Sequence, residues 1–177
     1  MLLPTEAGER TDLVREIERR AALVAGLPAG AAQVEPMQVV RYRFGEYYQP
    51  HHDAWPKEVA PSKHGNRNAT LFVYLNQMPA AEAGGGTAFP GLKLRVRPRV
   101  GSAVLWTNLQ QLGAEKGEQE IKALHMGEPL LCPTSTKFGA NIWLWDTPLF
   151  AINHPQTARK PEGKGRKRKR KRKRDEL

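Results

Sequence analysis

The chain has 177 residues, of which 40% are hydrophobic, and it contains 28 Lys and Arg, 18 Asp and Glu and one Cys. A domain of this size buries a substantial core, which excludes a wholly disordered chain. One cysteine excludes an internal disulfide and a thiolate zinc site, so any metal must use His and carboxylate ligands. No apolar run approaches the ~20 residues that span a bilayer, and the sequence predicts no membrane span in this chain.

The positive charge is concentrated near the C-terminus. Residues 159–177 hold twelve Lys or Arg and three acids, a net charge of +9, whereas residues 1–158 carry a net charge of only +1. The basic pI therefore describes a tail, and the nearly neutral body needs an explanation other than nucleic-acid binding.

The first predicted element is a helix over residues 11–27. Thr11 or Asp12 is a suitable N-cap, and apolar residues follow at spacings of three and four until Gly26 and Pro28. We expect this helix to pack against a sheet.

Short runs rich in strand-forming residues follow, separated by Gly and Pro clusters, at residues 37–44, 69–76, 92–96, 102–106 and 137–145. They favour an antiparallel sandwich or barrel over a doubly wound sheet. We predict one mainly β domain over residues 1–150, with its core at 36–146. The basic run within residues 151–177 repels itself and is expected to be disordered.

One segment carries the residue types of a metal site. In an extended strand, His51 and Asp53 point to the same face, whereas His52 points the other way. A third ligand must come from elsewhere, and His125 lies in a β-like segment far downstream. Two histidines and one carboxylate suit a non-haem Fe(II) oxygenase. The alternative for the short motif alone is a turn with polar side chains.

Six blocks in order resemble the prolyl 4-hydroxylase family of 2-oxoglutarate and Fe(II)-dependent dioxygenases. They are VVRYRFGEYYQPHHD (39–53), RNATLFVYLN (67–76), EAGGGTAFP (82–90), PRVGSAVLW (98–106), HMGEP (125–129) and KFGANIW (137–143). The resemblance implies a double-stranded β-helix, or jelly roll, in which His51, Asp53 and His125 hold Fe(II).

The resemblance also implies a place for 2-oxoglutarate. Lys137 matches the family lysine that meets the far carboxylate of this cosubstrate, and a dicarboxylate would supply the charged partner that a buried ammonium needs. The alternative is that Lys137 reaches the surface along its aliphatic stem. Tyr42 and Thr87 match the same pocket, although both residue types are also common in ordinary strands.

Substrate residues are carried over in the same way. Tyr48, Arg67 and Trp143 match positions that line a peptide groove, where aromatic rings suit a pyrrolidine ring. Core packing is the alternative for Trp143. Three features depart from the family pattern. Gly86 stands where the family usually has Glu, and Trp145 stands where the family often has a His after the second Trp. About two extra residues separate His125 from Lys137.

The implied activity is hydroxylation of peptidyl proline at C4, with Fe(II), 2-oxoglutarate, O2 and L-ascorbate, on proline-rich or collagen-like peptides. The competing hypothesis is a nucleic-acid-associated dioxygenase, or a noncatalytic protein that binds nucleic acid weakly and without sequence preference through the basic tail. The sequence does not define an oligomeric state.

Two addresses can be read from the tail. Residues 174–177 (RDEL) resemble a retrieval signal of the endoplasmic reticulum, and the preceding basic run resembles a nuclear signal. Entry into the endoplasmic reticulum requires a signal or anchor, and no signal peptide is visible near Met1. A location in the endoplasmic reticulum would therefore predict an incomplete N-terminus.

Overall fold

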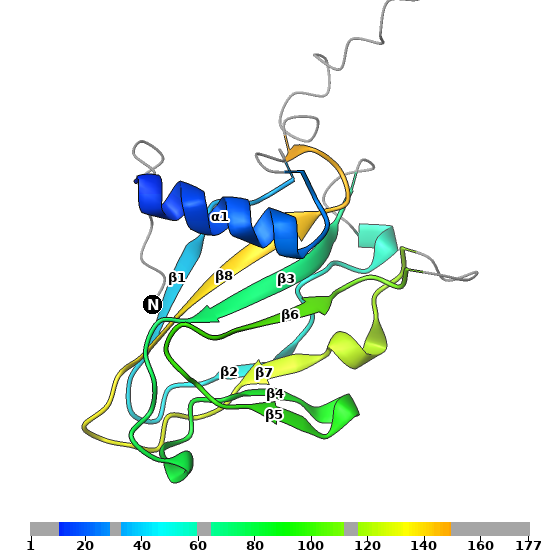
Figure 1. The fold of residues 1–177 in the computed structure, drawn as a ribbon. Helices are drawn as coiled ribbons and strands as arrows, with labels where there is room; N and C mark the ends of the chain where they lie inside the picture. The colour runs from blue at the N-terminus through cyan, green and yellow to red at the C-terminus, as the bar shows by residue number, and fades with distance from the viewer. Residues whose placement is uncertain (1–10, 29–32, 60–64, 112–116, 150–177) are drawn as a thin grey trace, which may run out of the picture.

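The computed structural model describes residues 11–28, 33–59, 65–111 and 117–149. The predicted tail, residues 151–177, lies outside these ranges. The described residues form one α-helix and two four-stranded sheets, in which all neighbouring strands are antiparallel (Figure 1). The mainly β jelly roll expected from the sequence is therefore confirmed.

The first sheet has the order β1-β8-β3-β6. Its strands are β1 (Gln38–Tyr42), β8 (Lys137–Trp145), β3 (Arg67–Tyr74) and β6 (Ala103–Thr107). The central pair, β3 and β8, is in register from Ala69 opposite Leu144 to Tyr74 opposite Gly139. This long pairing makes the first sheet the rigid wall of the domain.

The second sheet has the order β2-β7-β4-β5. It consists of β2 (Tyr48–His51), β7 (His125–Gly127), β4 (Thr87–Phe89) and β5 (Leu94–Val96). Its strands are short, and the two sheets lie one below the other in Figure 1. Phe72 and Tyr74 of β3 pack with Val40 of β1 and with Val96 of the second sheet, so apolar side chains join the two sheets.

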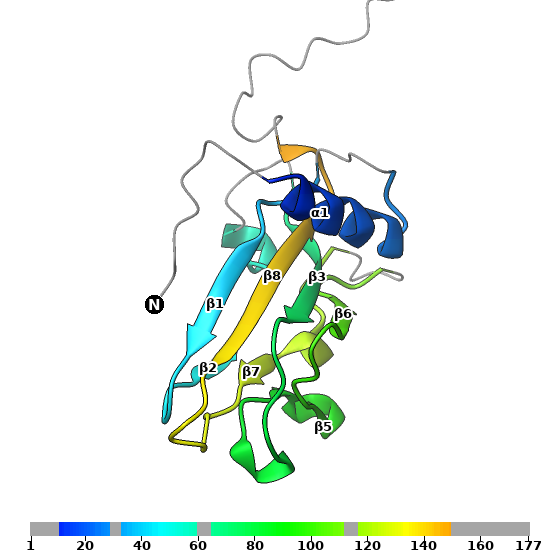
Figure 2. The same cartoon turned by 60° about the vertical axis from the view of Figure 1, so that its left-hand side comes forward.

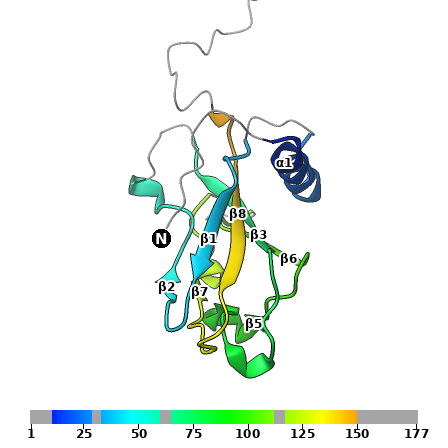
Figure 3. The ribbon, with the colours of Figure 1, turned by 90° about the vertical axis from the view of Figure 1, so that its left-hand side faces the viewer.

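Helix α1 (Asp12–Val24) packs against β8, on the side of the first sheet away from β2 and β7 (Figures 2 and 3). The Thr11 side chain accepts a hydrogen bond from the Val14 N–H at 3.3 Å, which confirms the expected N-cap. The helix ends earlier than predicted because Gly26 adopts φ +76° and the chain turns there.

The buried face of α1 differs from the apolar stripe in the sequence. Leu13 is 69% exposed, whereas Glu18 is only 6% exposed. Glu18 Oε1 accepts a hydrogen bond from the Met37 N–H at 3.0 Å, so this carboxylate joins the helix to the start of β1. Charged residues usually face solvent, and here a backbone partner stabilises the carboxylate in the interior.

Each of the five predicted runs contains a strand. The strands β2, β4 and β7 lie outside these runs. The segments of His51 and His125, which become β2 and β7, were expected to be extended, whereas three glycines precede Thr87 of β4 and make that segment resemble a turn. Among the described residues, α1 is the only α-helix, and the structure has no helix with the length and hydropathy of a membrane span in this part of the chain.

Candidate active site

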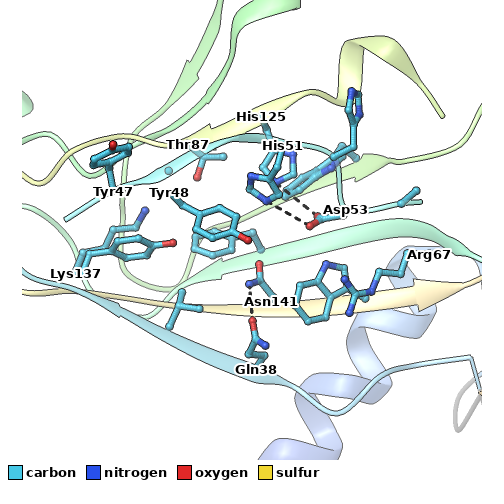
Figure 4. Close-up of a pocket in the computed structure, with 18 of the residues that line it drawn as sticks. Gln38, Tyr47, Tyr48, His51, Asp53, Arg67, Thr87, His125, Lys137 and Asn141 are labelled. Atoms are coloured by element: carbon cyan, nitrogen blue, oxygen red, sulfur yellow. Dashed lines mark hydrogen bonds and ion pairs between the residues drawn. The ribbon is translucent and has the colours of Figure 1, made fainter. Parts of the chain in front are cut away.

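A cavity of about 970 Å³ opens between the two sheets. All nine side chains that the sequence analysis singled out line it, from six of the eight strands and from the segment that follows β2. They are Tyr42, Tyr48, His51, Asp53, Arg67, Thr87, His125, Lys137 and Trp143. Figure 4 shows Lys137 and Arg67 at opposite sides of this cavity, with the two histidines and Asp53 between them.

His51, Asp53 and His125 form a cluster at the second sheet. β2 and β7 are paired so that His51 lies opposite His125, and the two imidazole centroids are 4.2 Å apart. Asp53 Oδ1 lies 3.7 Å from His51 Nε2, and Asp53 Oδ2 lies 3.7 Å from His125 Nε2. One ligand atom from each residue lies within 4.8 Å of the others, so the three side chains could hold one metal ion.

Both imidazoles are oriented by the backbone. His51 Nδ1 is 2.8 Å from the Gln49 carbonyl oxygen, and His125 Nδ1 is 2.9 Å from the Ala123 carbonyl oxygen. A carbonyl only accepts, so each Nδ1 carries the proton and each Nε2 presents a lone pair to the cluster. Burial lowers the pKa of His125, which favours the neutral, metal-binding form.

Asp53 follows the last residue of β2 and is 8% exposed. Burial alone would raise its pKa, but the adjacent imidazoles of His51 and His125 and the hydrogen bond from the Thr70 hydroxyl outweigh that effect, and the pKa lies below its usual value. The carboxylate is therefore ionised at neutral pH. Sequence reasoning missed Thr70, whose hydroxyl donates to Asp53 Oδ2 at 2.6 Å.

The donor set fits Fe(II). Two imidazole nitrogens and one carboxylate, on one face of a cavity, form the facial arrangement that leaves coordination positions open. His52 also borders the cavity but does not join the cluster, as the alternation along the strand predicts.

Lys137 lies at the other end of the cavity and is 1% exposed. Its Nζ lies 4.9 Å from the centroid of the Tyr42 ring and 5.3 Å from that of Phe72. In the described part of the chain, no ion pair joins this ammonium to a carboxylate. Burial lowers its pKa to about 8, a shift that the charge of Glu128 opposes. The alternative in which Lys137 reaches the surface is wrong.

Two hydroxyl groups accompany Lys137. Tyr74 Oη forms a hydrogen bond with Thr87 Oγ1 at 2.7 Å, which holds the Thr87 hydroxyl at the cavity wall. Burial raises the pKa of Tyr42 to about 12, and its hydroxyl therefore stays protonated at neutral pH. A cation and two hydroxyl groups converge at this end, which is the chemistry that binds a carboxylate.

The third part of the wall is aromatic. The Arg67 guanidinium lies 3.7 Å from the Trp143 ring centroid and 4.9 Å from that of Trp55. Its Nε and Nη2 donate to Glu35 at 2.7 and 3.0 Å, which fixes the stack. Tyr48 is half exposed at the opening, and its ring meets the edge of His51.

The three departures from the family pattern each have a local explanation. A β-carbon at Gly86 would collide with the carboxylate of Glu128, which forms an ion pair with Arg95 at 2.5 Å. Trp145 Nε1 donates to the Glu35 carboxylate that holds Arg67. The longer segment before β8 does not displace Lys137, which lies opposite Tyr42 in the register of the β1–β8 pair.

Gln38 and Asn141 are further cavity residues that the sequence analysis did not name. Asn141 Nδ2 donates to Gln38 Oε1 at 3.3 Å across the β1–β8 pair. A signal for Asn141 was present, because it lies two residues before Trp143 and four after Lys137 on the same face of one strand.

Comparisons with known proteins agree with this geometry. Residues 37–145 match the family model of the 2OG-Fe(II) oxygenase superfamily. Prolyl 4-hydroxylase subunit alpha-3 of Rattus norvegicus is 37% identical over 131 residues, and the Homo sapiens protein of that name is 36% identical over 131 residues. The match covers 72% of this chain but only 22% of either relative.

The structural comparison adds a viral enzyme. The viral collagen prolyl hydroxylase from Paramecium Bursaria Chlorella virus-1, in a 2OG complex, superposes with a TM-score of 0.64 at 27% identity. The superposition covers 82% of this chain and 77% of the viral chain. By its matched residues, its relatives and its fold, this chain belongs to the 2OG-Fe(II) oxygenase superfamily.

Proposed function

We propose that this chain is a dioxygenase that hydroxylates peptidyl proline at C4, with 2-oxoglutarate and O2 as cosubstrates and succinate and CO2 as coproducts. The observation that carries the proposal is one cavity that holds a His-Asp-His cluster, a buried lysine without a carboxylate partner among the described residues, and an aromatic wall. The similarity to prolyl 4-hydroxylase subunits and to the viral collagen prolyl hydroxylase supports it.

His51, Asp53 and His125 would hold the iron. Bound Fe(II), together with 2-oxoglutarate and O2, supplies the oxidising power for hydroxylation of an unactivated C–H bond. The chain supplies placement. The two backbone carbonyls fix the imidazole orientations, and the ionised Asp53 offsets the charge of the metal.

Lys137 binds the far carboxylate of 2-oxoglutarate, with Tyr42 and Thr87 as hydrogen-bond donors. These groups recognise the charge and the length of the cosubstrate at a fixed place in the cavity. Because the ammonium is buried among aromatic rings, the attraction is screened far less than it would be at the surface. Binding also gives the ammonium the partner that the chain itself does not supply.

The peptide lies along the aromatic wall, where Tyr48 and Trp143 contact the prolyl ring. Arg67 holds Trp143 in place through the stack and through Glu35. A proline-rich or collagen-like segment is already extended as polyproline II, so it loses little conformational entropy in a groove. Hydrophobic contact with the rings and exclusion of water place C4 near the metal cluster.

The experiment is an assay with purified protein, Fe(II), 2-oxoglutarate, ascorbate and a Pro-Pro-Gly repeat peptide. We expect 4-hydroxyproline in the peptide, identified by mass spectrometry and amino-acid analysis, with at least an equal amount of succinate released. His125→Ala is the matched inactive control. Ascorbate would sustain turnover by reducing iron oxidised in uncoupled cycles. Succinate release that no proline peptide stimulates would overturn the proposal.

The basic run at residues 166–174 favours a second candidate, a nucleic-acid-associated protein. Such a run supplies phosphate affinity that falls with salt and carries no sequence preference. The same succinate assay with a methylated oligonucleotide separates the candidates. Stimulation by the oligonucleotide, and none by the peptide, would favour the second.

A further inference from the structure

The position of Asp53 calls for a physical cause, because the regular sheet does not provide one. β2 ends at His51, and Asp53 lies beyond it in an irregular segment. His51 and His125 are fixed by their own strand pairing, but no strand ladder sets the distance from Asp53 to either imidazole. The carboxylate must therefore be held by side chains from other elements.

Two such side chains form a buried chain of hydrogen bonds. Thr70, in the middle of β3, donates its hydroxyl proton to Asp53 Oδ2 at 2.6 Å. Asn108, just after β6, donates from Nδ2 to Thr70 Oγ1 at 2.8 Å. Thr70 is 0% exposed and Asn108 is 1% exposed, so water does not compete for these contacts.

The direction of the chain follows from donor and acceptor chemistry. Ionised Asp53 can only accept, so the single proton of Thr70 must point to the carboxylate. Thr70 Oγ1 is then an acceptor toward Asn108, whose amide nitrogen can only donate. If the Asn108 amide were reversed, its oxygen would compete with Asp53 for the Thr70 proton. Asn108 thus sets the orientation of the hydroxyl that holds the carboxylate.

The backbone of the same segment is tied to the same side of the domain. The Asn108 N–H donates to the Asn68 carbonyl at 2.8 Å, which fixes Asn108 to β3. Gln119 Nε2 donates to the Ala54 carbonyl, one residue after Asp53, at 2.5 Å. The segment that carries Asp53 is therefore anchored at both its side chain and its backbone.

We propose that Thr70 and Asn108 are positioning residues that hold Asp53 in its metal-binding place, Thr70 directly and Asn108 through Thr70. The proposal rests on the metal site of the proposed function. It does not depend on proline being the substrate. Among the described residues, no hydrogen bond joins Thr70 or Asn108 to His51 or His125, so we expect their effect on the metal to pass through Asp53.

The test measures binding of Co(II) to the full chain, by calorimetry and by the visible absorption of the bound ion, without peptide or O2 chemistry. Thr70→Val removes the hydroxyl at nearly constant shape, and we expect the Co(II) dissociation constant to rise by roughly 10–100-fold. Thr70→Ser keeps the hydroxyl and should stay within about threefold of the unmodified protein. Thr107→Val, at an exposed position of β6, is the matched control.

A double-mutant comparison tests the series arrangement. Asn108→Leu alone should weaken Co(II) binding, and adding it to Thr70→Val should have almost no further effect, because the hydroxyl that it orients is gone. Independent, additive losses would overturn the assignment of Asn108. The assignment of Thr70 would be overturned if Thr70→Ser and Thr70→Val lost the same Co(II) affinity. It would also be overturned if the Co(II) dissociation constant of Thr70→Val stayed within about twofold of that of the unmodified protein.

Denaturant unfolding of each variant separates positioning from loss of fold. If Thr70→Val does not fold, the comparison of Asn108→Leu with the unmodified protein still decides the question. Altered Co(II) binding in an enzyme that hydroxylates no proline peptide would support the positioning role and defeat the proposed substrate. Unaltered binding in an active prolyl hydroxylase would do the reverse.

Discussion

The two ends of the cavity are built in opposite ways. At the metal end, the chain gives each of the three proposed ligands a hydrogen-bond partner. Carbonyl oxygens accept from Nδ1 of both imidazoles, and Thr70 donates to Asp53. At the cationic end, Lys137 is buried among aromatic rings, and its pKa falls to about 8. The first end is preorganised by its own partners, whereas the second holds a charge that a bound dicarboxylate completes.

The largest expected effect comes from breaking the metal end. His51→Ala, Asp53→Ala and His125→Ala should each reduce succinate release to background while the unfolding midpoint changes little, because none of the three belongs to the buried apolar cluster of Val40, Phe72 and Tyr74. The measurement is turnover together with Co(II) affinity. His52→Ala should be much milder, and a loss of metal affinity equal to that of His51→Ala would show that the strand alternation is misassigned.

Substitution of Lys137, at the cationic end, should leave metal binding unchanged. Lys137→Ala leaves the far carboxylate of 2-oxoglutarate without its partner, a loss of roughly 2–5 kcal/mol, so the apparent cosubstrate affinity should fall at least about tenfold. Lys137→Arg should recover part of it, because the planar guanidinium needs a different approach. Titration of 2-oxoglutarate at fixed Fe(II) measures both.

Peptide affinity at saturating cosubstrate provides the control for these variants. It should barely change, because the proposed peptide contacts are Tyr48 and Trp143. An unchanged requirement for 2-oxoglutarate in Lys137→Ala would move the anchor elsewhere in the cavity.

The pH dependence sharpens the same comparison. The pKa of Lys137 in the fold, about 8, lies below its ordinary 10.5, so the unfolded chain binds more protons between these values. The stability of the cosubstrate-free protein should therefore gain at most about 1.4 kcal/mol per pH unit across that window from this group. Denaturant midpoints from pH 7 to 10 measure it, with Lys137→Met as the control that lacks this gain.

Cosubstrate binding has the opposite pH dependence. It requires the ammonium, so the affinity for 2-oxoglutarate should decline as the pH rises through about 8. If the affinity for 2-oxoglutarate fell equally with pH in the unmodified protein and in Lys137→Met, the ammonium of Lys137 would not be the group that binds the cosubstrate.

The smallest effect on catalysis is expected from the tail. Removal of residues 159–177 takes away a net charge of +9 but none of the cavity residues. Proline hydroxylation should stay within about threefold, while nonspecific DNA or RNA binding at low salt should largely disappear. Fluorescence anisotropy with a labelled oligonucleotide measures the second. Retained nucleic-acid affinity would place the binding surface in the body.

The metal ligands could be predicted from the sequence, but the residues that hold them in place could not. The His51–Asp53 spacing and the resemblance at His125 indicated a metal site, and the family resemblance assigned Lys137 and Trp143 to the cosubstrate and peptide parts of the pocket. Thr70 and Asn108 are 38 residues apart and meet only because β3 pairs with β6. A contact made by sheet pairing leaves no local pattern, and the same is true of Glu18, whose burial depends on a backbone partner beyond the helix.

The most direct test of the two-ended cavity is an anaerobic titration of the Fe(II)-loaded protein with 2-oxoglutarate, followed by the metal-to-ligand charge-transfer band. We expect a saturable band in the unmodified protein and the same band in Lys137→Ala at a 2-oxoglutarate concentration at least about tenfold higher. We expect no band in Asp53→Ala. A band that saturates at the same concentration with and without Lys137 would show that this lysine does not bind the cosubstrate.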